Sequence, residues 1–428
     1  MGSNIAVIGT GYVGLTTGAC LAHLGNTVVC ADIVAEKVDA LNRGEVPILE
    51  AGLDELIQEG RRSNQLQFVL GAANAVHEAE FVYLCVPTPQ GADGSADLSY
   101  IQSAAREIAP HLSPETVVIN KSTVPVGSTR VVERELGRSD VSVVSNPEFL
   151  REGSAVHDFL HPDRVVIGAD DQGAAIRVAS LYLGLAAPLQ VTDPASAETI
   201  KYASNAFLAT KISFVNAIAA VCEAVGADVN DVVLGMGYDR RIGNAFLRPG
   251  PGWGGSCFPK DSHALVRIAE DAGYDFGLLK GVIGVNEDQF ARVADKIERT
   301  VGGSLEAKTV AVWGLTFKAR TDDLRDSPSL DIIGRLRDRG ALVQAYDPAV
   351  PNDDHPSLEG IEITDDPYAA VAGADVLAVL TEWDEFKWLD FDKVAEAMAT
   401  PRVVDGRNLL DRTGLQRRGF TYQGIGRS

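Results

Sequence analysis

The chain has 428 residues, 46% of them hydrophobic, so it is long enough for two or three globular domains that each bury a core. Its formal net charge of -21 argues against nucleic acid or an anionic membrane as a partner, because such surfaces are bound through clustered Lys and Arg. The sequence shows no N-terminal secretion signal and no uninterrupted apolar stretch approaching a membrane span, which predicts a soluble cytoplasmic protein.

Strand candidates come in two groups. Over about the first 190 residues, short β-rich apolar runs alternate with helical patterns, which is typical of parallel βαβ units. The candidates there are IAVIG, TVVCAD, FVYLCVP, TVVINKST, VSVVSNP and RVVIG. From residue 309 to 405 the scheme returns as TVAVWG, LVQAYD, DVLAVLT and RVVDG. The repetition predicts a second doubly wound sheet, although unrelated βα units also resemble one another.

The first strand leads into GTGYVG, residues 9–14, which opens a helical run. Gly9 permits a tight turn, Gly11 lets a pyrophosphate approach the backbone, and Gly14 lets helix and strand pack closely, while the helix N-terminus favours phosphate charge. Asp32 closes the next strand, where a carboxylate accepts hydrogen bonds from the adenosine ribose and repels a 2′-phosphate. The strand, the helix and the acid follow one another at the spacing of a dinucleotide-binding motif, which favours an NAD site over a structural turn.

A long helix is predicted between the two groups of strands. Residues 195–225 contain neither Gly nor Pro, Asp193 and Pro194 suit the N-cap and the first turn, and Gly226 suits the end. Apolar residues occur on nearly every face of this helix, so it should be covered by a partner subunit as well as by the flanking domains. The sequence therefore predicts a homodimer and an α/β fold: two Rossmann-like, doubly wound parallel-sheet domains joined by a long central helix.

The loop PGPGWGGSCFPKD, residues 249–261, presents one thiol among glycines and prolines. Cys257 precedes a helix whose first turn should hold Pro259, a position that stabilises a thiolate, and Lys260 adds positive charge. A nucleophilic thiol beside an NAD site indicates aldehyde-level chemistry, in which the thiol adds to a carbonyl, hydride leaves, and water hydrolyses the thioester. The alternative is a flexible linker with an incidental cysteine. The other cysteines, which lie in apolar runs and should be core residues, are Cys20, Cys30, Cys85 and Cys222.

Other polar residues could serve this chemistry. Lys201 and Asn205 lie i, i+4 on the long helix, where they could hold an oxyanion together or form an ordinary polar edge. Glu148 and Glu152 in NPEFLREGSA offer carboxylates, and Thr123 in NKSTVPVGST offers a hydroxyl, but each could equally be a solvated loop residue.

A metal site is not predicted. His157 and His161 are also spaced i, i+4, with Asp158 and Asp163 nearby. Pro162 interrupts any helix there, and no third ligand of suitable spacing is present in the sequence.

Taken together, these features resemble the UDP-glucose/GDP-mannose dehydrogenase family from Asn4 to about Arg407. The matching motifs are GTGYVG, CVPTP, KSTVPVGS, NPEFLREGSA, ETIKYASNAFLATKISFVN, RIGNAFLRPGPGWGGSCFPKD, GLTFKARTDDLRDSP and VVDGRN. The resemblance implies an NAD-binding domain at 1–193, a central helical dimerisation segment with the Cys loop at 194–300, and a UDP-sugar-binding Rossmann-like domain at 301–428. It also implies two successive NAD-dependent oxidations at C6 of a nucleotide sugar, from alcohol to acid, without release of aldehyde.

The resemblance assigns catalytic roles to named residues. Cys257 would form first a thiohemiacetal and then a thioester, and Lys201 and Asn205 would stabilise the developing oxyanion. Asp261, with Thr123, would position a water that assists proton transfer.

Further residues follow from the same resemblance. Glu148 would be the base for thioester hydrolysis. The implied cofactor residues are Gly9, Gly11, Tyr12, Val13, Gly14, Asp32, Lys37, Thr88, Thr123, Glu152, Lys260 and Arg325. The implied substrate residues are Glu148, Phe149, Leu150, Arg151, Glu152, Lys201, Asn205, Arg241 (reaching across the dimer), Phe246, Leu247, Arg248, Pro249, Gly250, Gly254, Lys318 and Arg407.

The Cys loop is most similar to that of the UDP-glucose members, which favours UDP-glucose as substrate and UDP-glucuronate as product. Trp253 stands where the family usually has Tyr or Phe. GDP-mannose and UDP-N-acetylmannosamine are the alternative substrates. A single-step NAD-dependent hydroxyacid or polyol-phosphate dehydrogenase, with an incidental Cys257, is a rival enzyme, and a non-enzymatic NAD-responsive regulator is a third interpretation.

Overall fold

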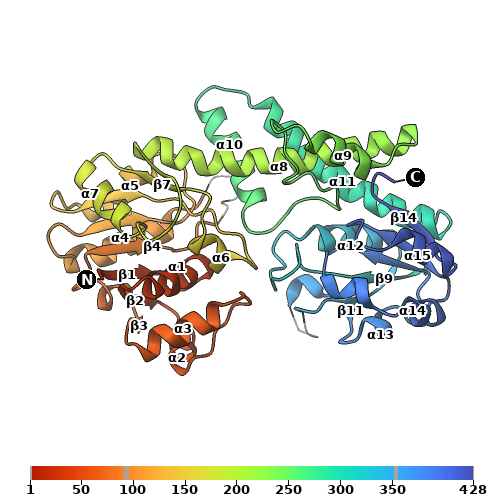
Figure 1. The fold of residues 1–428 in the computed structure, drawn as a ribbon, viewed down its shortest axis with the longest axis horizontal. Coiled ribbons are helices and arrows are strands. Elements are labelled where there is room, and N and C mark those ends of the chain that lie inside the picture. The colour runs from red at the N-terminus through yellow and green to blue at the C-terminus, as the bar shows by residue number, and fades with distance from the viewer. Residues whose placement is uncertain (1, 90, 92–95, 351–354, 428) are drawn as a thin grey trace. The chain divides into compact units, whose positions relative to one another are not determined.

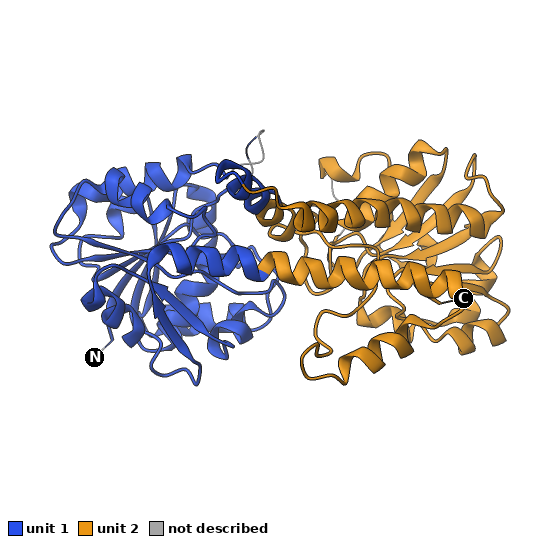
Figure 2. Ribbon diagram, turned by 90° about the horizontal axis from the view of Figure 1, so that it is seen from above, with its two compact units in different colours: residues 1–204, 263–273 blue, residues 205–262, 274–428 orange. Residues whose placement is uncertain are grey.

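The computed structural model describes residues 2–89, 91, 96–350 and 355–427, and they form two compact units (Figure 2). Unit 1 comprises Met1–Ser204 and His263–Gly273, and unit 2 comprises Asn205–Ser262 and Tyr274–Ser428. Each unit holds a largely parallel sheet with helices on both faces, so the expected α/β class with two doubly wound domains is confirmed (Figure 1). The three-part division at residues 193 and 300 stays a prediction.

Unit 1 contains an eight-stranded sheet in the order β3-β2-β1-β4-β5-β6-β7-β8. Its strands are β1 (Asn4–Ile8), β2 (Thr27–Asp32), β3 (Leu66–Leu70), β4 (Phe81–Leu84), β5 (Val117–Asn120), β6 (Ser142–Ser145), β7 (Val165–Gly168) and β8 (Leu189–Thr192). All neighbours are parallel except β6 and β7, which pair antiparallel at Ser145 and Gly168. The six predicted strands are confirmed, and the two that the sequence pattern missed, β3 and β8, are the edges of the sheet.

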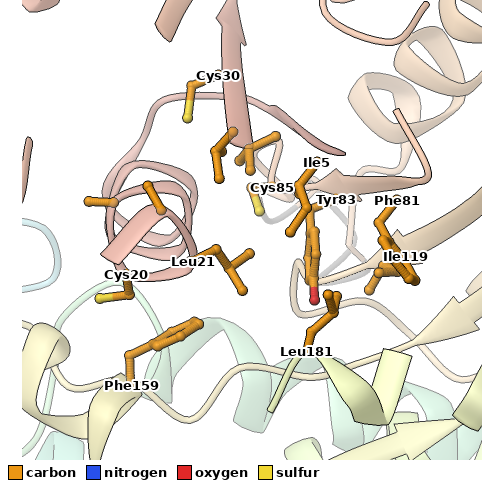
Figure 3. Close-up of a cluster of buried hydrophobic side chains, with 14 of the residues drawn as sticks. Ile5, Cys20, Leu21, Cys30, Phe81, Tyr83, Cys85, Ile119, Phe159 and Leu181 are labelled. Carbon is orange, nitrogen blue, oxygen red and sulfur yellow. The ribbon is translucent and has the colours of Figure 1, made fainter. Parts of the chain in front are cut away.

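Alternating side chains of the strands enter two cores. Ile5 and Val7 of β1 pack in a cluster with α1, α2, α3, α6 and α7, whereas Ala6 and Ile8 face α4 and α5. Figure 3 shows part of the first cluster, where Tyr83 lies among side chains from the sheet and from α1 and α6. The helices of unit 1 are α1 (Tyr12–His23), α2 (Ala35–Arg43), α3 (Leu53–Arg62), η1 (Ala72–Asn74), α4 (Ser99–Ile108), η2 (Ala109–His111), α5 (Ser128–Leu136), α6 (Ala155–Leu160) and α7 (Gln172–Ser180).

Unit 2 contains a six-stranded parallel sheet in the order β11-β10-β9-β12-β13-β14. Its strands are β9 (Thr309–Trp313), β10 (Leu342–Tyr346), β11 (Glu362–Ile363), β12 (Val376–Val379), β13 (Arg402–Asp405) and β14 (Thr421–Gly424). The four predicted strands form the centre, and the two missed strands, β11 and β14, are again the edges. The other elements are α9 (Val229–Gly237), α11 (Gly277–Val301), α12 (Pro328–Asp338), η3 (Pro356–Leu358), α13 (Pro367–Ala370), η4 (Asp384–Trp388), α14 (Phe391–Ala397) and α15 (Arg412–Arg417).

The predicted long helix is α8 (Pro194–Val225). Its N-cap is Asp193, whose Oδ1 accepts a hydrogen bond from the Ser196 amide at 2.9 Å, and Gly226 ends it with φ +75°. Within the described residues, α8 is the one helix that is long and apolar enough to cross a membrane by length and composition alone, with a mean hydropathy of 1.5 in its most apolar window, but charged residues such as Lys201 and Lys211 interrupt it, so it is not an uninterrupted apolar stretch. Its apolar residues also enter the core of unit 2, where Val215 is fully buried.

Candidate active site

The loop between β1 and α1 has the shape of a phosphate-binding turn. Gly9 has φ +98°, and a Cβ there would lie 2.7 Å from the carbonyl oxygen of Cys85. A Cβ on Gly14 would lie 1.9 Å from the Gly9 carbonyl oxygen, whereas one on Gly11 would meet nothing within 4 Å. The loop is therefore tightly closed against the protein and open at Gly11, where a pyrophosphate would approach the N-terminus of α1.

Asp32 ends β2 beside this loop. Its Oδ2 accepts from the Thr10 amide at 2.9 Å and the Thr10 hydroxyl at 2.6 Å, and its Oδ1 accepts from the Val34 amide at 3.0 Å. Burial alone would raise the pKa of Asp32, but these hydrogen bonds and the charge of Lys37 on α2 hold that pKa below its ordinary value. The carboxylate is thus ionised at neutral pH, as an acceptor for ribose hydroxyls requires.

The corresponding acid of unit 2, Asp347 after β10, is fully engaged. Its Oδ2 accepts from the Leu315 amide at 2.7 Å, from the amide and hydroxyl of Thr316 at 3.0 Å, and from Trp383 Nε1 at 3.2 Å. Its Oδ1 accepts from the Ala349 amide at 2.9 Å. Asp32 also binds its own loop, but it is partly exposed, whereas Asp347 is buried and accepts in addition from Trp383, so the Asp347 carboxylate is not available to a ribose.

The cysteine loop is fastened to α8 and α11 within unit 2. The amide of Gly250 donates to Asn216 Oδ1 at 2.8 Å, and its carbonyl accepts from Gln289 Nε2 at 2.8 Å. The amide of Trp253 donates to Asn286 Oδ1 at 2.8 Å, and its carbonyl accepts from Asn286 Nδ2 at 2.9 Å. The buried indole of Trp253 also donates to a serine hydroxyl of α8 at 2.8 Å. The aromatic residue therefore anchors the loop.

The glycines after Trp253 bring the loop against the 314–328 segment. A Cβ on Gly254 would lie 1.8 Å from the carbonyl oxygen of Asp326, and one on Gly255, which has φ +81°, would lie 2.7 Å from the Phe317 ring. Only residues without a side chain allow this approach.

Arg407 joins the same region. Its Nη2 donates to the Phe317 carbonyl at 3.1 Å and its Nε to the Leu380 carbonyl at 2.8 Å, and its Nη1 would lie 3.4 Å from a Cβ on Gly250. Lys318 lies with Nζ 5.1 Å from the centroid of the Phe317 ring. Three motifs that are far apart in the sequence thus meet in unit 2, where Arg407 and Lys318 lie beside the cysteine loop.

Cys257 is the residue before α10 (Phe258–Asp271), and its carbonyl accepts the Asp261 amide at 2.9 Å. The helix predicted after the thiol is therefore confirmed. Cys257 is partly exposed, whereas the other four cysteines are buried. Burial raises the pKa of Cys20 and of Cys85 to about 12, so these two thiols stay neutral. Cys257 is the accessible thiol.

Asp261 lies on the first turn of α10 and is fully buried. Its Oδ2 accepts from Asn205 Nδ2 at 2.6 Å, and its Oδ1 accepts from Lys260 Nζ at 2.8 Å. The structure therefore brings together three predicted site residues, with the amide of Asn205 oriented by a carboxylate.

Lys201 and Glu148 form a second buried pair, in unit 1. Lys201 Nζ donates to Glu148 Oε1 at 2.9 Å, and the Leu150 amide donates to Oε2 at 2.7 Å. Burial works to raise the pKa of Glu148, but the charge and hydrogen bond of Lys201, the Leu150 amide and the charge of Lys121 together lower it. Lys201 and Asn205, one turn apart on α8, are thus each held by a carboxylate.

The remaining predicted cofactor residues are spread over several segments of the chain. Thr88 Oγ1 donates to the Thr123 carbonyl at 2.8 Å, and Tyr12 OH contacts Glu50 and accepts the Gly153 amide. Val13 and Glu152 are partly buried, and Lys37 is exposed. Arg325 is exposed and pairs with Asp323 at 2.7 Å.

Several predicted substrate residues lie at the surface of their unit. Arg241 is exposed and pairs with Asp239 at 2.6 Å, and Arg248 is exposed. Leu247 and Pro249 are buried, and Phe246 has φ +62°. Arg151 is exposed in unit 1, where it pairs with Asp158.

His157 and His161 stack with ring centroids 4.7 Å apart. Within the described ranges, no group of three or more His, Cys, Asp or Glu side chains is arranged to hold a metal ion.

The residues that support the site were not predicted from the sequence. Asn216, Gln289 and Asn286 fasten the cysteine loop, but in the sequence they look like ordinary polar positions of helices. Lys121 is the first residue of the KSTVPVGS motif, and a lysine directly after an apolar strand is the sequence feature that could have indicated it.

Comparison with known proteins shows the family to which the chain belongs. The family models for the NAD binding, central and UDP binding domains of UDP-glucose/GDP-mannose dehydrogenases match residues 3–186, 195–288 and 311–412. The chain belongs to this family. It is 47% identical to the UDP-glucose 6-dehydrogenase TuaD of Bacillus subtilis (strain 168), over 99% of this chain and 93% of that protein. It is also 47% identical to the UDP-glucose 6-dehydrogenase of Rhizobium meliloti (strain 1021), over 99% of each chain.

A solved structure of a UDP-glucose dehydrogenase from Pyrobaculum islandicum has the same fold, with a TM-score of 0.92 and 37% identity, covering 100% of this chain and 98% of that one. This chain therefore has an N-terminal NAD-binding domain, in agreement with the geometry at Gly11 and Asp32.

Proposed function

We propose that this protein is a UDP-glucose 6-dehydrogenase that oxidises the C6 alcohol of UDP-glucose to the acid, UDP-glucuronate, in two NAD-dependent steps. The observation that carries the proposal is Cys257, an accessible thiol at the start of α10 on a loop fastened through Gly250 and Trp253. The relatives of nearly full length that are named UDP-glucose 6-dehydrogenase support UDP-glucose as the substrate.

NAD, when bound at the 9–14 loop and Asp32, supplies the hydride acceptor for both oxidations. In the first, the C6 hydroxyl loses its proton and C6 itself loses a hydride, and the chain stabilises the developing negative oxygen with Lys201 and Asn205. Asp261 orients the Asn205 amide through its 2.6 Å hydrogen bond, and with Thr123 it positions a water that takes the hydroxyl proton.

In the second half of the reaction, the Cys257 thiolate adds to the aldehyde carbon and forms a thiohemiacetal. Loss of the second hydride and of the hydroxyl proton leaves a thioester on Cys257. Glu148 accepts a proton from water, whose oxygen attacks the thioester carbon, and the carbon–sulfur bond breaks to return the thiolate and release the acid. The sum is two NAD⁺ reduced for each alcohol oxidised to a carboxylate.

The cations of unit 2 suit a nucleotide diphosphate. Arg407 and Lys318 lie beside the cysteine loop, in a chain whose net charge is -21. Such local cations are needed because a strongly acidic protein otherwise repels a diphosphate.

We also propose that the protein is a homodimer through α8. Phe207, Phe214 and Val221 are spaced seven residues apart on this helix and are 65%, 50% and 55% exposed. A different face of α8 is buried in unit 2 by residues such as Val215 and Ala219. An apolar seam with a seven-residue period suits the same helix of a second copy. The dimer would also provide the setting in which Arg241 reaches the partner's substrate.

The deciding experiment measures NADH and UDP-glucuronate together. Wild-type protein with UDP-glucose and NAD should form two NADH for each UDP-glucuronate, and Cys257→Ser should form no acid. Cys222→Ser, a matched loss of a thiol in the core, should retain turnover. One NADH for each sugar, or acid formation by Cys257→Ser, would reject the covalent mechanism.

Substrate choice is tested in the same assay. UDP-glucose, GDP-mannose and UDP-N-acetylmannosamine are each supplied with NAD and with NADP. We expect the highest kcat/KM for UDP-glucose with NAD, and a higher value for either other sugar would replace UDP-glucose in the proposal.

A further inference from the structure

Unit 1 contains a buried lysine that the mechanism above does not use. Lys121 follows β5, is 5% exposed, and donates from Nζ to Asn146 Oδ1 at 3.0 Å. The ammonium lies 5.9 Å from the centroid of the Phe159 ring and 5.8 Å from that of Tyr182. No carboxylate in the part of the chain that the structure describes is within ion-pairing distance of it. Burying a positive charge without a counter-ion is costly, so its position calls for a function.

Asn146 and its neighbours fix this ammonium in place. Asn146 Oδ1 also accepts from Tyr182 OH at 2.6 Å, and Asn146 Nδ2 donates to the Val166 carbonyl at 2.8 Å. The hydroxyls of Tyr182 and Tyr83 lie 3.1 Å apart, and Figure 3 shows Tyr83 inside the apolar cluster. Because Asn146 is held at both ends, its oxygen has a fixed direction, and Lys121 is held with it.

The charge of Lys121 acts on Glu148. Glu148 is two residues after Asn146, whose Oδ1 accepts from Lys121 Nζ at 3.0 Å, so the ammonium is held close to the segment that carries this carboxyl. From there its charge lowers the pKa of Glu148 without an ion pair, whereas Lys201 pairs with the carboxylate directly at 2.9 Å. Lys201 and Lys121 have different roles in the proposed reaction. Lys201 is required at the reacting oxygen, so Glu148 loses part of its direct stabilisation when an oxyanion forms. A buried carboxyl without a cation takes up a proton and can then no longer accept one from water.

We propose that Lys121 is a positioning residue that keeps Glu148 ionised while Lys201 is engaged with the reacting oxygen. Lys201 is the partner that changes during the cycle, and Lys121 is the partner that does not. This inference rests on the proposed function, in which Glu148 is the base for thioester hydrolysis.

The other ionisable groups around Glu148 leave this assignment intact. Burial raises the pKa of Cys85, next to Glu148 and Lys121, to about 12, so this thiol is neutral. Tyr182 contributes a hydroxyl that donates to Asn146. Arg164 lies 3.6 Å from the centroid of the Phe149 ring, beside Glu148 in the sequence, and keeps the same charge in every variant considered below.

The test compares the pH dependence of thioester hydrolysis in Lys121→Met and Lys121→Arg. The acyl-enzyme is formed with UDP-glucose and NAD, and its decay is followed by mass spectrometry of the Cys257 peptide. For Lys121→Met we expect the acid limb of the rate to move up by about one pH unit or more, which is a loss of about tenfold on that limb. The rate on the alkaline plateau should return to within about threefold of wild type. Lys121→Arg should keep the wild-type limb because it retains the charge.

A purely structural role predicts a different pattern, in which both variants lower the rate equally at all pH values. That pattern, or an unshifted limb in Lys121→Met, would overturn the proposal. If Lys121→Met does not fold, Lys121→Gln, which keeps a donor toward Asn146, is measured in its place with the same two outcomes. Failure of the proposed function is seen separately, because wild-type protein would then form no acyl-enzyme at Cys257.

Discussion

Replacing Gly254 by alanine tests whether the cysteine loop depends on its contact with the 314–328 segment. The new Cβ would lie 1.8 Å from the carbonyl oxygen of Asp326 and 2.8 Å from Cδ of Pro328. Side-chain carbons are essentially never closer than 3.0 Å to such atoms, so the loop or its neighbour must move by at least 1.2 Å. The obstacle is backbone, which does not turn aside as a flexible side chain does.

The size of the effect follows from the position of the loop. A displacement of about 1 Å at a reacting group costs about a hundredfold in rate. Since Gly254 is three residues before Cys257, we expect kcat/KM to fall by about a hundredfold. We also expect the free energy of unfolding to fall by about 1–3 kcal/mol, the usual cost of overpacking.

NADH formation from UDP-glucose and chemical denaturation measure these two quantities. The matched control is Gly281→Ala on α11, where the new methyl group meets nothing within 4 Å. This control should keep full activity and gain about 0.5–1 kcal/mol of stability, because alanine favours a helix over glycine. Turnover of Gly254→Ala within threefold of wild type would refute the reasoning.

Three further predictions concern charge, core and cofactor. Glu148→Gln removes a carboxylate whose pKa is lowered by folding. Such a carboxylate stabilises the folded protein at pH values above its unfolded pKa of about 4.3, and this stabilisation is lost as the pH falls through the lower pKa of the folded state. The stability difference from wild type, measured by denaturation at several pH values, should therefore be largest near neutral pH and shrink on acidification; a constant difference contradicts this. Trp313→Ala empties a fully buried site and should cost about 3–5 kcal/mol in denaturant melts, and a loss below 1 kcal/mol would show that the site collapses. Asp32→Ala should raise the KM for NAD by about 10–100-fold, and an unchanged KM would remove Asp32 from the cofactor site.

The strands show which part of this fold a sequence pattern predicts. Every strand in the interior of the two sheets was predicted, because its buried positions form an apolar run. The four missed strands, β3, β8, β11 and β14, are the sheet edges. Edge strands are short and partly exposed, as in β8, where three of four residues are exposed, so their apolar signal is weak.

The candidate site shows a similar division. The motifs predicted that Cys257 precedes a helix and that Gly14 lets the first helix and strand pack closely, because both are local properties of the chain. They did not predict that Glu148 pairs with Lys201 or that Asp261 pairs with Asn205, since these contacts join residues more than fifty positions apart. The first depends on how α8 packs against the segment after β6, and the second on how α8 packs against the start of α10, which no local pattern encodes.

The engagement of Asp347 has a consequence for engineering. Grafting GTGYVG onto the end of β9 would not by itself convert the second sheet into a dinucleotide receptor, because Asp347 is buried and would still accept from Trp383 Nε1 at 3.2 Å, whereas Asp32 is partly exposed. Releasing that acid would also loosen the segment that carries Phe317 and Lys318 toward the cysteine loop. The two sheets share an architecture, but the burial of Asp347 means that an exchange of the loops alone would not exchange their binding properties.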